Sequence, residues 1–150
     1  MKKLTNLLFL LLLALLFASL ASCSAPSEFQ KKTTLQIGNN ARYYCDKITP
    51  IIDDSNAPNI EKTVSRKLFE ENKITAEKLF STIRPKNYIF PKPAQKEAIN
   101  VLEKNAEWFF NNAVRYIYMN DKIPETYKKQ LKTHLKNNYE LSKSLKESIE

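Results

Sequence analysis

The chain contains a single glycine, Gly38, among its 150 residues. Glycine makes up about 7% of average proteins. It supplies the positive φ angles that tight β-hairpin turns need, and it lets the backbone approach a phosphate group closely. The scarcity of glycine therefore argues against a hairpin-rich β fold and against a phosphate-binding loop.

From Leu35 onward, apolar residues recur at three- and four-residue steps, which places them on one face of a helix. Pro50, Pro85 and Pro124 mark boundaries, since the residue before a proline avoids the α conformation. The pattern loosens at residues 70–73, so the second helix is either continuous or broken there. An all-α antiparallel bundle of about four helices is expected, with helices in residues 35–49, 58–84, 93–120 and 124–149.

Trp108, Phe109 and Phe110 are consecutive in the third expected helix, so their side chains spread over about 200° of its surface. They cannot all enter one narrow seam. This helix is therefore expected to be contacted on two sides or to leave one ring exposed. The connector before it, residues 86–93, carries large apolar side chains, and packing back onto the domain is favoured over contact with a partner.

The first 22 residues have the layout of an export signal. A cationic start, Met1-Lys2-Lys3, precedes an almost wholly apolar run from Leu7 to Leu20. That run is shorter than the about 20 apolar residues that cross a bilayer comfortably. The signal ends in Leu20-Ala21-Ser22-Cys23, and these four residues resemble the lipobox of bacterial lipoproteins.

In lipoproteins of this kind the cysteine sulfur carries a diacylglyceryl group, the chain is cut before the cysteine, and the new amino terminus usually receives a further acyl chain such as palmitate. The resemblance covers only the first 23 residues. It implies a signal peptide in residues 1–22 and a lipid anchor on Cys23, with no other cofactor expected. Ser24 at the next position resembles lipoproteins sent to the outer membrane of Gram-negative cells; in other bacteria the outer face of the cell membrane is implied.

Residues 24–34 are polar and show no apolar periodicity. Together with Cys23 they are expected to form a flexible tether, which leaves residues 35–150 as the helical domain. The signal holds two of the 24 basic residues and none of the 16 acidic ones, so residues 23–150 carry a formal charge of +6. This charge favours anionic partners, although nucleic acid is not expected for an exported protein.

No set of residues stands out as catalytic or metal-binding. His134 is the only histidine, and no glutamate lies three or four residues from it on the expected helix. Cys45 falls on an apolar helix face, where core packing is favoured, although a bond to another chain is also open. A hydrolase would need Cys45, His134 and an acid to converge in one pocket. The protein is therefore expected not to be an enzyme.

Two groups of side chains are candidates for binding. Trp108, Arg115 and Tyr118 are spaced to share one side of the third helix, and their residue types are typical of protein contacts. Lys129, Lys132 and Lys136 lie on one face of the last helix, where a solvated surface is favoured over contact with anionic headgroups or lipopolysaccharide. The sequence thus predicts an envelope lipoprotein that binds another envelope, surface or foreign protein, as an assembly, inhibitor, immunity or exclusion factor. A bundle that holds a lipid or other apolar ligand is the alternative.

Overall fold

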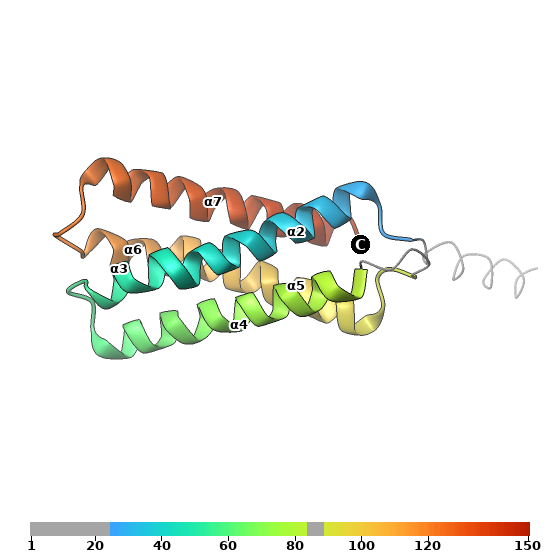
Figure 1. Cartoon of the computed structure of the whole chain (residues 1–150), viewed down its shortest axis with the longest axis horizontal. Coiled ribbons are helices and arrows are strands. Elements are labelled where there is room, and N and C mark those ends of the chain that lie inside the picture. The colour runs from blue at the N-terminus through green and yellow to red at the C-terminus, as the bar shows by residue number, and fades with distance from the viewer. Residues whose placement is uncertain (1–24, 84–88) are drawn as a thin grey trace, which may run out of the picture.

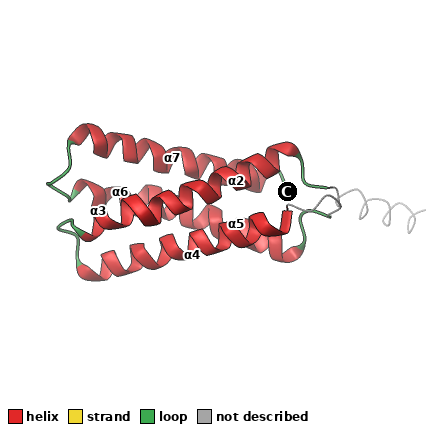
Figure 2. Ribbon diagram, viewed as in Figure 1, coloured by secondary structure: helices red, strands yellow, loops and turns green. Residues whose placement is uncertain are grey.

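The computed structural model describes residues 25–83 and 89–150. The predicted export signal and the predicted lipid attachment site, Cys23, lie outside the described residues. The described chain is all-α, as expected, and forms an antiparallel bundle of four long helical stretches (Figures 1 and 2). The start of α2 and the end of α7 lie at one end of the bundle, which we call the anchor-side end because the predicted lipid attachment at Cys23 precedes α2 in the chain. The loops that follow α3 and α6 lie at the opposite, distal end (Figure 1).

The first stretch begins with α2, Glu28–Tyr43. The Ser27 hydroxyl accepts a hydrogen bond from Gln30 N at 3.1 Å, and the Gln30 side chain accepts one from Ser27 N at 2.9 Å. This capping box satisfies amide groups that a helix start otherwise leaves without partners. Thr33 and Thr34 are buried. The prediction of a flexible tether is therefore wrong over residues 28–34, because capping and burial compensate for their polar composition.

Pro50 does not end this stretch, contrary to the prediction. A π-helix, Tyr44–Ile48, follows α2 and leads directly into α3, Thr49–Asp53. The Thr49 amide donates to the Tyr44 carbonyl, five residues back. Pro50 thus lies in the first turn of a new α-helical segment, where its missing N–H costs little.

The second stretch, α4, runs unbroken from Asn59 to Ile83. The loosened pattern at residues 70–73 arises because Asn72, a polar residue, occupies an inner position and is fully buried. Lys73 and Glu70 form an ion pair at 2.9 Å on the outside of the same turn. The helix therefore continues through the point where a break was considered.

The third stretch consists of α5, Pro93–Trp108, a π-helix, Phe109–Ala113, and α6, Val114–Tyr118; the fourth is α7, Glu125–Glu147. The third stretch is contacted on two sides, as predicted. Phe109 is fully buried, while Phe110 stacks on Tyr139 of α7 with 6.3 Å between ring centroids.

The buried apolar side chains form two clusters along the bundle axis. The distal cluster is centred on Tyr44, Phe69 and Phe109, and includes Leu131 and Leu135. The anchor-side cluster consists of Ile37, Ala41, Ala76, Leu79, Ile83, Phe90, Ile99, Leu102 and Leu145. Phe90 is 2% exposed, so the described part of the connector packs back onto the bundle through this ring.

Candidate functional site

The seam between α6 and α7 is fixed by an aromatic ring and a buried lysine. The Lys128 Nζ lies 5.9 Å from the centre of the Tyr118 ring and donates to the Tyr118 carbonyl at 3.2 Å. Lys128 is 5% exposed, and its charge is paired with Glu125 at 2.9 Å. About two turns earlier in the third stretch, Phe110 stacks on Tyr139. These contacts define the side of α7 that meets α6.

The predicted lysines continue from this seam onto the surface. Lys132 is four residues after Lys128, and Lys136 is three residues before Tyr139, so both follow the same side of α7. Lys129 follows Lys128 directly, so its side chain is rotated by about 100° around the axis of α7 from that of Lys128. Across the seam, Arg115 is one turn from Tyr118. We call the exposed cations Arg115, Lys129, Lys132 and Lys136, together with Tyr118, the basic face.

The charge of the basic face is not compensated locally. None of its four cations forms an ion pair with a residue that the structure describes. Two acids of α7 lie within four residues of these lysines: Glu125, which pairs with Lys128, and Glu140, which follows Lys136. Clustered like charges concentrate a field that attracts an oppositely charged surface and speeds its association. The arrangement is therefore suited to bind an anionic partner.

Trp108 does not belong to this face. Its ring packs against Phe109 and Tyr116, with centroids 6.1 and 6.4 Å away, and the Tyr116 hydroxyl bonds to Glu61 of α4. Trp108 thus lies toward the α4 edge, whereas Tyr118 lies toward α7. The intervening π-helix, whose hydrogen bonds span five residues, turns the chain less per residue than an α-helix does. Regular α-helical spacing, which predicts one shared side for Trp108, Arg115 and Tyr118, does not include this shift.

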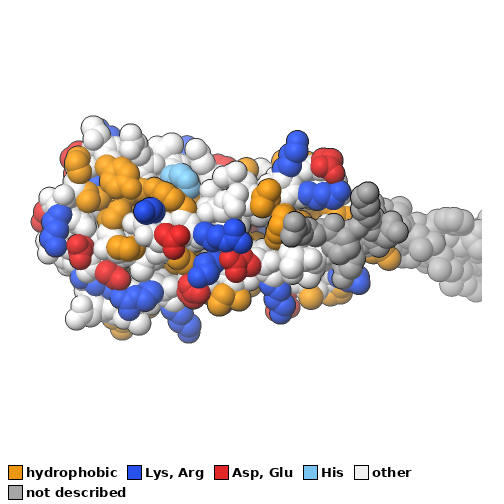
Figure 3. All heavy atoms as spheres, viewed as in Figure 1, with side chains coloured by type: hydrophobic (Ala, Val, Ile, Leu, Met, Phe, Trp, Pro, Cys, Tyr) orange, Lys and Arg blue, Asp and Glu red, His pale blue; other side chains and the backbone are white. Residues whose placement is uncertain are grey.

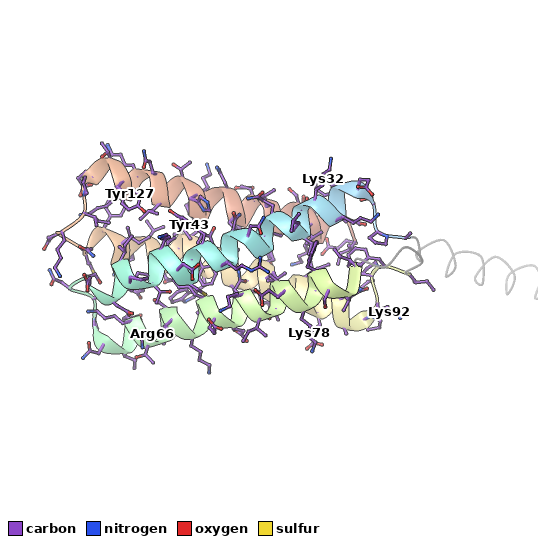
Figure 4. All side chains as sticks on the ribbon, viewed as in Figure 1. Lys32, Tyr43, Arg66, Lys78, Lys92 and Tyr127 are labelled. Carbon is purple, nitrogen blue, oxygen red and sulfur yellow. The ribbon has the colours of Figure 1, made fainter. Side chains whose placement is uncertain are left out.

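His134 is part of an aromatic contact between α2 and α7. Its ring stacks on Tyr43 at 4.8 Å, and its Nδ1 lies 3.3 Å from the Tyr44 hydroxyl oxygen. Burial lowers the pKa of His134, so the imidazole is neutral at pH 7. Burial, together with a hydrogen bond with Tyr127, raises the pKa of Tyr43 to about 12. Figure 4 shows Tyr43 and Tyr127 between the two helices, and Figure 3 shows the histidine among hydrophobic side chains.

Cys45 faces a different neighbour. Its Sγ lies 3.6 Å from the Glu70 carboxylate on α4, and the thiol is free and partly exposed. Burial and the negative charge of Glu70 raise the pKa of Cys45 to about 11, so the thiol is protonated at neutral pH. The contacts of Cys45 and of His134 thus lie on the α4 side and the α7 side of the first stretch. They do not bring the two residues together as a nucleophile and its base.

A buried polar layer, which the apolar periodicity of the sequence does not indicate, separates the two apolar clusters. Asn40 Nδ2 donates to Asn138 Oδ1 at 2.9 Å between α2 and α7. Asn72 of α4 lies one turn from Phe69 of the distal cluster and one turn from Ala76 of the anchor-side cluster. Among the described residues, no hydrogen-bond partner is found for Asn72 Nδ2 and Oδ1, Asn138 Nδ2 and Ser142 Oγ. In the sequence, the signal for this layer is the presence of asparagines at positions where the helical periodicity expects apolar residues.

The hollows that bear on a ligand-binding role are open to solvent. A groove of about 390 Å³ between α4 and α5 is lined by apolar and polar side chains, among them Ile74, Leu79 and Val101. A second groove, of about 270 Å³, lies beside Gly38 between α2 and α4. Within the described ranges there is no group of three or more histidine, cysteine or acidic side chains placed to hold a metal. No described helix is both long and apolar enough to span a membrane.

Comparison of the chain with protein-family models, with curated proteins and with solved structures finds no match.

Proposed function

We propose that this protein is a cell-envelope lipoprotein, anchored through lipid on Cys23, whose helical bundle binds an acidic protein partner through the basic face. The observation that carries the binding role is the set of exposed cations on α6 and α7, none of which forms an ion pair with a described residue: Arg115, Lys129, Lys132 and Lys136. Tyrosine and arginine are typical anchors of protein interfaces. The anchor rests on the resemblance of residues 20–23 to a lipobox, and the partner is recognised by its negative charge.

The place of the basic face in the bundle favours a partner over the protein's own membrane. The anchor would attach just before α2, at the anchor-side end. Lys129 lies near the start of α7, so the rise of the helix separates it from Glu147 by about 27 Å. In an upright bundle, headgroups beside the anchor are beyond the reach of a lysine side chain at that distance. A second protein in the envelope can approach the distal end directly.

Replacing Cys23 with alanine will abolish incorporation of labelled palmitate and leave uncleaved precursor, because the acceptor sulfur is lost. Labelling is measured in a bacterial host that processes lipoproteins. Cys45→Ala is the matched control, since Cys45 is the chain's other cysteine, and this variant will be labelled and cut normally. Normal labelling of the Cys23→Ala protein would contradict the lipid anchor.

Reversing charges on the basic face will weaken capture of the partner. We expect the triple variant Arg115→Glu, Lys132→Glu, Lys136→Glu to lose about tenfold or more in crosslinking of an acidic envelope protein to the full lipidated chain. The control triple has the same net charge change at exposed lysines of α4 and α5: Lys67→Glu, Lys78→Glu and Lys104→Glu.

The control is expected to retain capture, and added salt is expected to reduce capture by the native protein. Equal losses in both triple variants would show that only net charge matters and would overturn the assignment of the basic face. Circular dichroism of both variants verifies that the bundle is folded.

A further inference from the structure

The chain is fixed to the bundle very close to the proposed anchor. Pro26 is buried, and Ser27 caps α2 through the reciprocal bonds with Gln30. Gln30 Nε2 in turn donates to the Ser148 carbonyl, beyond the end of α7, at 3.0 Å. Pro26 is three positions after Cys23, and so short a segment spans at most about 11 Å. A lipid on Cys23 therefore holds the anchor-side end of the bundle at the membrane surface.

The anchor-side end carries two large apolar side chains that are exposed to solvent. Phe29, in the first turn of α2, is 49% exposed, and Ile89, in the connector that leads to α5, is 53% exposed. Neither side chain belongs to the anchor-side cluster, in which Phe90, the residue after Ile89, is buried, so the exposed pair is not needed to fill the core. Figure 4 shows Lys32 and Lys92 at the same end.

The charges at this end are mixed. Glu28 is paired with Lys31 at 2.8 Å. Lys32 and Lys96 are exposed, as are Glu147 and Glu150. With both signs present, electrostatic attraction to anionic lipid is weak, and burial of apolar area is the favourable term that remains.

From this geometry, and resting on the lipid anchor of the proposed function, we propose that the anchor-side end docks on the bilayer, with Phe29 and Ile89 inserted among the phospholipid headgroups. Apolar side chains bury to a depth of about 5–10 Å at this boundary. The anchor removes most of the entropic cost of bringing the two surfaces together, because it makes contact effectively intramolecular. Docking holds the bundle upright and presents the basic face away from the membrane.

The test uses the full lipidated chain with Cys45→Ala, reconstituted into phosphatidylcholine vesicles that contain nitroxide-labelled lipid. An environment-sensitive fluorophore is attached at Phe29→Cys or Ile89→Cys. The control is Ile60→Cys, because Ile60 is 72% exposed but lies at the distal end. We expect emission from positions 29 and 89 to shift to shorter wavelength and to be quenched severalfold more than emission from position 60.

Two failures can be told apart by flotation. If the protein floats with the vesicles but positions 29 and 89 are quenched no more than position 60, the proposed docking of the anchor-side end is wrong, while the lipid anchor is supported. If the protein does not float with the vesicles, the anchor itself is wrong, and the docked end falls with it. Because all three labelled side chains are exposed, the substitutions leave the core intact.

Discussion

Phe109→Ala will lower the free energy of unfolding by about 3–5 kcal/mol, the loss expected when a fully buried phenylalanine is removed from a core. The Phe109 ring lies 4.3 Å from that of Phe69 and 6.0 Å from that of Tyr44, measured between centroids. It therefore joins the first, second and third helical stretches. Alanine leaves a cavity that three rigid helices cannot close, and denaturant unfolding followed by circular dichroism measures the loss.

Phe110→Ala is the matched control for this prediction, since the same atoms are removed one residue along the chain. Phe110 is only partly buried, and its ring partner is Tyr139. We expect this variant to lose about 1 kcal/mol. Equal losses for the two variants would contradict the placement of Phe109 at the centre and Phe110 at the edge.

Asn72→Leu will raise the free energy of unfolding by about 1–3 kcal/mol. The Asn72 amide is fully buried, and neither of its polar atoms has a hydrogen-bond partner among the described side chains and backbone. Burying an unpaired amide costs roughly this much in proteins. Leucine is branched at the same carbon and lies between Phe69 and Ala76, so it can join the two apolar clusters. The midpoint of urea unfolding is expected to rise while its slope stays constant.

Asn40→Leu provides the contrast, because it removes a polar group that is bonded. Asn40 donates to Asn138 at 2.9 Å, and Gln36 donates to Asn40 at 3.0 Å. This variant leaves the side-chain oxygen of Asn138, Oδ1, buried without its donor. We expect the free energy of unfolding to fall by about 1–3 kcal/mol. If Asn72→Leu also destabilised the protein, the Asn72 amide would have polar partners in solution, and the cost assigned to it would be wrong.

Periodicity and proline positions predicted the all-α bundle and most helix boundaries, because an amphipathic stripe and a missing N–H act locally. The same local reasoning placed the helix start at Leu35 instead of Glu28. The signal for the earlier start was present in the serine and glutamine of the capping box. The capping box alone does not show that the helix starts there, because the early start also depends on the burial of Thr33 and Thr34 against other helices.

Only the three-dimensional structure shows that the predicted binding residues Trp108 and Tyr118 lie on different sides of the third stretch. The π-helix at Phe109–Ala113 turns Trp108 toward α4, whereas Tyr118 meets Lys128 across the α7 seam. No residue type marks a π-helix in the sequence, since the change in hydrogen-bond register is selected by packing against neighbouring helices. The sequence likewise does not show that α6 packs against α7, which places Arg115 and the lysines of α7 on neighbouring helices.

The sequence by itself determined the class of fold and the basic charge, and it predicts lipid attachment at Cys23, since each depends on residue type and order along the chain. Only the tertiary structure decided that Asn72 is buried, that Cys45 and His134 have separate partners, and that Phe29 and Ile89 are exposed at one end. Burial and contact are properties of packed helices, and small changes in helix register rotate every later side chain to a new neighbour.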